Sequence, residues 1–304
     1  MAVATGRRKL NKADLLAGIL VLLVSVGLMA AVVFALQSLE DNLPGSTTAL
    51  PPTTTTVATA PPEPLPTLAP NPYEKGDFVY DANGYLSCLA GESWLGVDVS
   101  EHQGQIDWTQ VATTDVKFAM VRLAYRGWGT EGVIRPDARG LENLEGAALA
   151  GLQVGVYFFS QAITVEEAVE EARFVLQMLD GRDLDMPIVY DWETVSSEDA
   201  RTKDMDPKTL NACALAFCRE IEAAGYEAMV YFNLDLAKRM FDLLAIQAAG
   251  YDFWLAMYTD GLGYAHRVRM WQYTSSGSVA GIKGRVDLNL YFPHPFATFT
   301  WQTG

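Results

Sequence analysis

The chain has 304 residues, half of them hydrophobic, which is enough for one large folded domain and additional segments. Its 37 acidic and 22 basic residues give a formal net charge of −15. This excess of negative charge argues against nucleic-acid binding, which usually leaves a basic footprint. It does not exclude polymeric substrates that are held by hydrogen bonds and stacking.

The N-terminal region has the pattern of a membrane anchor. Basic residues in the segment 1–14 precede an uncharged run, LLAGILVLLVSVGLMAAVVFAL, at 15–36. At about 1.5 Å per residue, a helix of this length spans the roughly 30 Å hydrocarbon core of a bilayer. The position of the basic residues places 1–14 in the cytoplasm and the rest of the chain outside. A cleavable signal peptide is the alternative, but its apolar stretch is usually about 7–15 residues long.

We therefore expect a single transmembrane helix at 15–37 that contacts the lipid bilayer. The segment 38–72 is rich in Pro and Thr, and it predicts a disordered, extended spacer. A lead-in segment follows at 73–93, and the sequence assigns it no function. The folded domain is expected at 94–304.

Short apolar runs alternate with amphipathic stretches after residue 94. The runs predict eight strands, at 94–100, 116–124, 152–160, 186–193, 226–233, 252–259, 267–274 and 284–292. Helices are predicted at 139–150, 164–179 and 207–224. Continuous apolar strands are typical of parallel strands that are covered on both faces. The pattern predicts an α/β fold, an irregular (β/α)8-type barrel, because the segments between the last three strands are short and only weakly helical.

An open doubly wound sheet is the structural alternative to the barrel. Its nucleotide-binding versions carry a Gly-rich phosphate loop after the first strand, and no such loop is present here. The barrel is therefore the preferred interpretation.

Four acidic residues lie in or at the end of predicted strands: Asp98 in the first, Asp191 and Glu193 in the fourth, and Asp287 in the last. Residues i and i+2 of a strand share one face, so Asp191 and Glu193 point the same way. The carboxyl ends of parallel barrel strands meet at one mouth, where active sites form. Carboxylates held close together raise at least one pKa, which leaves a proton for acid catalysis. A single acid of this kind is usually a helix cap or an ion-pair partner, but the set of four favours an active site.

Other chemistries have little support in the sequence. The three His residues have no metal-ligand spacing, and no Ser lies in a nucleophile elbow, so we expect no metal and no cofactor. His102 follows the first strand, either lining the mouth or lying in a solvated loop. Cys88, Cys213 and Cys218 predict buried free thiols, with one disulfide to Cys88 as the alternative.

Five segments of the folded region resemble one known family. They are GVDVSEHQGQIDW (96–108), FAMVRLAYRGWG (118–129), GLQVGVYFFSQA (151–162), PIVYDWE (187–193) and MWQYTSSGSVAGIKGRVDLNLY (270–291). Together they are similar to glycoside hydrolase family 25, the Chalaropsis-type lysozymes. These enzymes are N-acetylmuramidases that cut the glycan strands of peptidoglycan. The resemblance extends over residues 94–292.

The resemblance implies an irregular β/α barrel with an acidic groove at its mouth. It makes Glu193 the general acid, Asp191 the second catalytic carboxylate, and Asp98 and Asp287 the supporting acids. The family often has Tyr-His-Phe in the third strand, where this chain has Tyr-Phe-Phe at 157–159.

Aromatic rings near strand ends can form the stacking walls that sugars need, although mid-strand rings more often belong to the core. The candidate substrate-binding residues are Tyr125, Tyr157, Trp192, Tyr231, Tyr258, Trp271 and Gln272.

The expected function is that of an outward-facing, membrane-anchored lysozyme that acts as a monomer on peptidoglycan. Because Asp191 and Glu193 lie on one side of the sugar, the inverting route is disfavoured, since it needs acid and base on opposite faces. We expect retention, with the 2-acetamido group of the substrate as nucleophile and Asp191 orienting it. A non-catalytic wall-binding module and a glycosidase for another amino-sugar polymer such as chitin are the alternatives.

Overall fold

The structure, a computed structural model, describes residues 67–293. The predicted transmembrane helix at 15–37 and most of the predicted spacer at 38–72 lie outside the described residues. Within 67–293, none of the helices combines the length and the apolar character that crossing a membrane requires.

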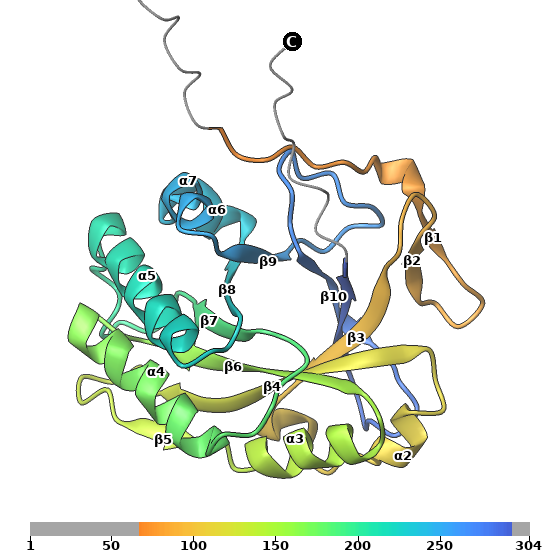
Figure 1. The fold of residues 1–304 in the computed structure, drawn as a ribbon, viewed down its shortest axis with the longest axis horizontal. Coiled ribbons are helices and arrows are strands. Elements are labelled where there is room, and N and C mark those ends of the chain that lie inside the picture. The colour runs from red at the N-terminus through yellow and green to blue at the C-terminus, as the bar shows by residue number, and fades with distance from the viewer. Residues whose placement is uncertain (1–66, 294–304) are drawn as a thin grey trace, which may run out of the picture. The chain divides into compact units, whose positions relative to one another are not determined.

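The described residues form a closed eight-stranded barrel (Figure 1). The strands are β3 (Trp94–Val99), β4 (Val116–Arg126), β6 (Gln153–Ser160), β7 (Ile188–Trp192), β8 (Ala228–Asn233), β9 (Asp252–Ala256), β10 (Met270–Gly277) and β11 (Val286–Tyr291). The barrel closes because β3 pairs with β4 on one side and with β11 on the other. A short strand, β5 (Ile134–Pro136), pairs with the far end of β4. All eight predicted strands are present, so the prediction of an α/β barrel is confirmed.

The last strand differs from the prediction in its direction. Strand β11 runs antiparallel to both β10 and β3, whereas the other neighbouring barrel strands run parallel. The reason is the short connection 278–285, since a parallel crossover needs about a dozen residues or more. Strand β11 therefore begins at the end of the barrel where the parallel strands finish. This end is called the mouth below, and the opposite end is called the base.

Helices cover the outside of the barrel unevenly. The three predicted helices are present as α3 (Gly140–Leu149), α4 (Val165–Leu179) and α5 (Pro207–Ala223). Shorter helical segments are η1 (Lys75–Asp77), η2 (Glu101–Gln103), α2 (Trp108–Val111), α6 (Leu234–Arg239) and α7 (Leu243–Ala248). In the described chain, no helix lies between β9 and β10 or between β10 and β11, which confirms an irregular barrel.

Alternate residues of each strand supply two separate cores. The residues Ile188, Tyr190 and Trp192 of β7 face the outer helices, while Val189 faces the barrel interior. The interior is filled by large side chains, including Phe118, Met120, Met186, Met229, Trp254, Met270 and Tyr291. Gly96 makes room for this filling, because a Cβ atom there would lie 2.3 Å from the Phe118 ring. Because the interior is filled, a site within the barrel must lie at one of its ends.

The lead-in segment packs on the outer wall of the barrel. It contains a hairpin of β1 (Phe78–Tyr80) and β2 (Leu86–Cys88). The Phe78 ring lies 5.1 Å from the Trp271 ring, and the Tyr73 ring lies 4.8 Å from that of Phe292. This contact covers a part of the barrel that has no helix.

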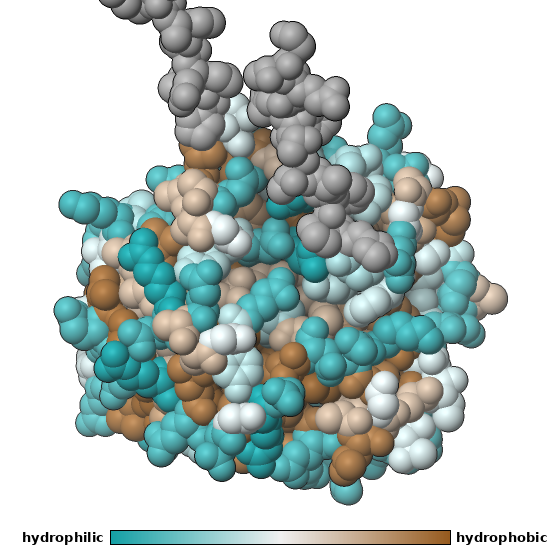
Figure 2. Space-filling model, in the orientation of Figure 1, coloured by the Kyte–Doolittle hydropathy of each residue, from teal (hydrophilic) through white to brown (hydrophobic). Residues whose placement is uncertain are grey.

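Two further features of the domain concern its surface and its thiols. The face shown in Figure 2 is a mosaic in which hydrophilic and hydrophobic residues alternate. The cysteines are all free; Cys213 and Cys218 are buried, and Cys88 is half-buried. This arrangement confirms the prediction of free thiols and not the alternative of a disulfide.

Candidate active site

A cavity of about 290 Å³ opens at the mouth of the barrel. All four predicted acids line it, although they come from three different strands. The lining consists of Asp98, Ser100, His102, Gln103, Arg122, Tyr157, Phe159, Asp191, Glu193, Tyr231, Trp254, Tyr258, Gln272, Ser275 and Asp287. Aromatic rings and carboxyl groups thus share one concave surface.

Strand β7 places Asp191 and Glu193. Asp191 is the fourth residue of the strand, and Glu193 directly follows its end. A fully buried amide holds this end in place: Gln161 Nε2 donates to the carbonyl oxygens of Glu193 (2.9 Å) and Ser160 (2.8 Å). Gln161 Oε1 in turn accepts a hydrogen bond from Thr202 Oγ1 (2.9 Å). The backbone that carries Glu193 is therefore fixed to the end of β6 and to the segment after β7.

Asp98 is the centre of a buried hydrogen-bond network. Its Oδ2 accepts from Gln272 Nε2 (2.9 Å) and from Asn289 Nδ2 (2.7 Å). Asn289 Oδ1 accepts from Trp254 Nε1 (2.8 Å), so the amide of Asn289 is also fixed. Asp287 lies directly opposite Asp98 in the β3–β11 ladder, and the two carboxyl groups share a hydrogen bond. The antiparallel direction of β11 is what brings Asp287 to the mouth.

Burial and mutual repulsion keep protons on this cluster of acids. Burial, with the nearby charge of Asp98, raises the pKa of Glu193 to about 7. The same two causes raise the pKa of Asp287 to about 8. Burial and the charges of Glu193 and Asp98 raise the pKa of Asp191, while Arg122 opposes the rise. The site can therefore hold a transferable proton near neutral pH.

Arg122 is a cavity residue that the sequence analysis did not identify. Its Nε forms a 2.8 Å ion pair with Asp137, and its Nη2 lies 3.3 Å from Glu101. The guanidinium carbon lies 5.1 Å from the centre of the Tyr125 ring. A cation in the middle of a largely apolar strand was the signal that could have identified it, because burying a charge is costly unless the charge is paired.

Four of the seven predicted substrate-binding residues line the cavity: Tyr157, Tyr231, Tyr258 and Gln272. The Tyr258 hydroxyl donates to Gln272 Oε1 at 3.0 Å, which connects this tyrosine to the network around Asp98. Tyr258 is 57% exposed, so most of one ring surface is open for a ligand. Trp254, Asn289 and Ser275 belong to the site or its support and were not among the candidates.

The other three candidates lie elsewhere. Trp192 and Trp271 are fully buried in the outer core, and Trp271 Nε1 donates to the carbonyl oxygen of Met257 at 2.8 Å. The alternation of the strand explains this, since a residue between two that face the mouth must face outward. Tyr125 packs beside Arg122 and does not line the cavity. Side chains without surface in the cavity cannot contact a sugar there.

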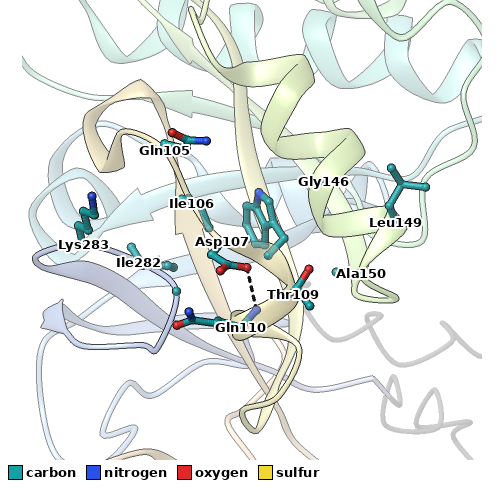
Figure 3. Close-up of a pocket in the computed structure, with 12 residues that line it drawn as sticks. Gln105, Ile106, Asp107, Thr109, Gln110, Gly146, Leu149, Ala150, Ile282 and Lys283 are labelled. Atoms are coloured by element: carbon teal, nitrogen blue, oxygen red, sulfur yellow. Dashed lines mark hydrogen bonds between the residues drawn. The ribbon is translucent and has the colours of Figure 1, made fainter.

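A larger cavity, of about 750 Å³, lies on the side of the barrel between α2, the end of α3 and the segment 281–283 (Figure 3). Its one carboxylate, Asp107, caps α2 by accepting from the backbone N–H of Gln110 (3.1 Å), as the dashed line in Figure 3 shows. Because it has no second acid, this cavity lacks the pair that glycoside hydrolysis usually requires. The mouth is therefore the candidate active site.

The chemistry available at the mouth can now be stated. A proton donor and a second carboxylate lie on one side of a cavity that has aromatic walls, which suits cleavage of a glycosidic bond. In the described part of the chain, no group of three or more His, Cys, Asp or Glu residues is arranged to hold a metal ion.

Comparison with known proteins assigns the family. The sequence model described as Glycosyl hydrolases family 25 matches residues 97–282, more than half of the chain. The chain belongs to glycosyl hydrolases family 25. It is therefore a glycoside hydrolase, and the resemblance found in the sequence is confirmed.

Two relatives of this family 25 chain illustrate the range of the match. The uncharacterized protein YegX of Escherichia coli K12 is 28% identical over 209 residues, which cover 64% of this chain and 68% of YegX. The autolytic lysozyme of Clostridium acetobutylicum is 25% identical over 197 residues, 64% of this chain and 54% of the relative.

Solved structures of family 25 relatives share the fold. The autolysin LytC of Streptococcus pneumoniae, also solved in complex with a synthetic peptidoglycan ligand, is 26% identical with a TM-score of 0.57. The match covers 71% of this chain and 50% of LytC, so the chain spans about half the length of that relative. A family 25 glycosyl hydrolase of Bacillus anthracis is 22% identical with a TM-score of 0.54. The match covers 66% of this chain and 89% of the Bacillus anthracis chain.

Proposed function

We propose that this glycoside hydrolase cuts the β-1,4 bond between N-acetylmuramic acid and N-acetylglucosamine in peptidoglycan. The observation that carries the proposal is the pair Asp191 and Glu193, which opens into a cavity with aromatic walls. The autolytic lysozyme among the relatives and the peptidoglycan ligand of LytC support this substrate.

Glu193 is the general acid of the proposed reaction. With a pKa of about 7, it holds its proton at and below neutral pH. It donates that proton to the glycosidic oxygen, so that the bond from the anomeric carbon to this oxygen breaks and the leaving sugar departs as an alcohol. The hydrogen bonds of Gln161 hold the backbone of Glu193 in position for this transfer.

Asp191 assists the attack on the anomeric carbon. The carbonyl oxygen of the 2-acetamido group of the substrate attacks and forms a cyclic intermediate, while Asp191 accepts a hydrogen bond from the amide N–H. A water molecule then opens the ring, and the Glu193 carboxylate takes the proton of this water. This route fits two acids on one side of the sugar and retains the configuration of the anomeric carbon.

The remaining residues of the cavity hold the substrate and support the acids. The tyrosines Tyr157, Tyr231 and Tyr258 supply ring surface for sugars, and Gln272 joins Tyr258 to Asp98. Asp98 keeps negative charge near Glu193, which favours its protonated form, and Asp287 shares a hydrogen bond with Asp98.

The location of the enzyme is part of the proposal. The uncharged run at 15–37 anchors the chain in the cell membrane with 1–14 in the cytoplasm, and the Pro/Thr-rich spacer extends from the outer face. The catalytic domain then acts as a monomer on the glycan strands of the cell wall.

The proposal is tested with the full chain purified in detergent and incubated with insoluble peptidoglycan. Release of fragments with reducing N-acetylmuramic acid ends is expected. Glu193→Gln should reduce the rate about 10²- to 10⁴-fold, the usual contribution of a general acid. The control is Glu198→Gln, which changes an exposed acid nearby and should leave the rate unchanged.

Three outcomes would contradict the proposal. Reducing N-acetylglucosamine ends would show that the other glycosidic bond is cut. Faster digestion of chitin than of peptidoglycan would indicate a different amino-sugar polymer. Binding to peptidoglycan without turnover would indicate a wall-binding module.

A further inference from the structure

The start of the described chain runs beside the long loop between β9 and β10 (Figure 1, orange beside blue). The two segments are antiparallel: the N–H of Arg267 donates to the carbonyl of Ala69 (2.8 Å), and the N–H of Asn71 donates to that of Ala265 (3.0 Å). The loop 257–269 descends from the mouth to the base, while the lead-in ascends. Residues 67–80 are called the brace below.

The side chain of Asn71 also connects the brace to the loop. Its Nδ2 donates to the carbonyl oxygens of Leu262 (3.1 Å) and Tyr264 (2.9 Å). Its Oδ1 accepts from the backbone N–H of Tyr73 (3.0 Å). One side chain therefore satisfies two loop carbonyls and also fixes the turn of the brace.

The contact continues upward, towards the mouth. A Cβ atom on Gly261 would lie 2.6 Å from the carbonyl oxygen of Lys75, so the two backbones touch at this point. The Tyr80 hydroxyl then donates to Asp260 Oδ1 at 3.2 Å. Asp260 is only two residues from Tyr258, which lines the cavity.

The loop itself has little internal structure to hold Tyr258. Residues 257–269 contain no helix and no strand apart from the isolated bridge of His266 to Pro70 in the brace. At the mouth, the Tyr258 hydroxyl is held by Gln272 and Ser275. The neighbouring Met257 is held by the Gln272 carbonyl, which accepts from its N–H (3.0 Å), and by Trp271 Nε1, which donates to its carbonyl oxygen (2.8 Å). Below that point, the contacts to the brace set the path of the loop.

We propose that the brace is a positioning element of the active site, and that Asn71 acts through the loop to hold the Tyr258 ring against the sugar. The brace lies outside residues 97–282, which match the family, so this device is additional to the matched region. The part of the proposal that concerns the sugar rests on the proposed function. The claim that Asn71 fixes the path of the loop does not depend on the proposed function.

The test combines amide hydrogen exchange and kinetics on the full chain in detergent. Asn71→Ala should accelerate exchange in 257–267 without affecting β7. On soluble peptidoglycan fragments it should raise KM about three- to tenfold, the effect of losing hydrogen bonds of ordinary strength, with kcat within about twofold. The control is Asn83→Ala, an exposed residue in the turn of the lead-in hairpin, which should leave exchange and KM unchanged.

A double-substitution cycle assigns the effect to Tyr258. If the brace acts through this ring, Asn71→Ala should add little to the rise in KM that Tyr258→Ala causes. Gly261→Ala, which pushes the loop away from Lys75, is the second variant, should Asn71→Ala fail to fold. Unchanged exchange in the loop, or effects on KM that simply add, would overturn the proposal. An inactive unsubstituted chain would refute the proposed function, and the exchange comparison alone would then decide whether the brace holds the loop.

Discussion

Asp98 and Asp287 lie opposite each other on the antiparallel strands β3 and β11, and their carboxyl groups share a hydrogen bond. Such a bond needs one proton between the two groups. Burial raises the pKa of Asp98, but the amides of Asn289 and Gln272, from which it accepts, and its hydrogen bond with Asp287 oppose this rise and favour its ionised form. The proton therefore belongs to Asp287, whose pKa is raised to about 8. The charge that stays on Asp98 acts on Glu193.

The first prediction concerns the pH dependence of the reaction. As the proposed general acid, Glu193 must be protonated, so activity should be lost as the pH rises through its pKa of about 7. Removing the charge of Asp98 lowers the pKa of Glu193, so Asp98→Asn should move this alkaline limb to lower pH, whatever its effect on the maximal rate. The pH profile of kcat/KM measures this. A limb that stays in place or moves up would show that Asp98 does not control the acid.

The second prediction concerns the pH dependence of stability. The folded pKa of Asp287, about 8, lies above the value of about 4 for an unfolded chain. Between these values the folded state holds a proton that the unfolded state releases, so stability falls as the pH rises. Asp287→Asn removes this loss. The Tm of the variant minus the Tm of the unsubstituted chain should therefore increase between pH 4 and pH 8. A Tm difference that is independent of pH would contradict the assignment.

The third prediction concerns stereochemistry. The proposed reaction retains the configuration of the anomeric carbon, so the first-formed product should be the β anomer. Proton NMR during the first minutes of hydrolysis distinguishes the anomers before mutarotation. An initial α anomer would rule out retention and would require a water molecule activated on the opposite face.

The fourth prediction concerns Gln161. Its amide holds the backbone of Glu193, so Gln161→Leu should lower kcat more than it raises KM and should accelerate exchange in 193–202. Asn211→Leu offers a control, because Asn211 makes comparable side-chain-to-backbone bonds to Pro207 and Met240, and none of these three residues lines the cavity. The control should lose stability without a selective loss of kcat. Equal effects of both substitutions on kcat would mean that Gln161 is only structural.

The fifth prediction concerns the filled interior. A methyl group on Gly96 would meet the Phe118 ring at 2.3 Å, so Gly96→Ala should reduce the free energy of unfolding by about 1–3 kcal/mol, the usual cost of overpacking. Gly76→Ala is the matched control, because no atom lies within 4 Å of a Cβ at that position. Urea unfolding of both variants provides the comparison. Equal stability of the two would show that the interior can adjust.

The sequence was sufficient to predict the barrel and its four acids. Apolar runs marked all eight strands, and the spacing of Asp191 and Glu193 placed both on one face. The same alternation would have excluded Trp192 and Trp271, which point outward because their neighbours in the strand point to the mouth.

Other features depend on contacts between distant segments, which no local pattern reveals. The antiparallel pairing of β11 with β3 joins the two ends of the barrel, although the short connection before β11 was a local sign of its direction. The place of Asn289 depends on Asp98, 191 residues away in the sequence. Asn71 contacts Leu262 across a similar separation, and it lies in a segment whose composition predicts a spacer.

The reversed last strand has a consequence for how the enzyme meets a solid substrate. Because β11 descends, its end at Tyr291 pairs with Trp94 at the base, where β3 begins. Ala69 is bound at the same end, by the side chain of Gln247 before β9 and by Arg267 before β10. The described chain thus both arrives and departs at the base. Under the proposed function, a tether joined to either end of the described chain would be attached at the base, at the opposite end of the barrel from the cavity.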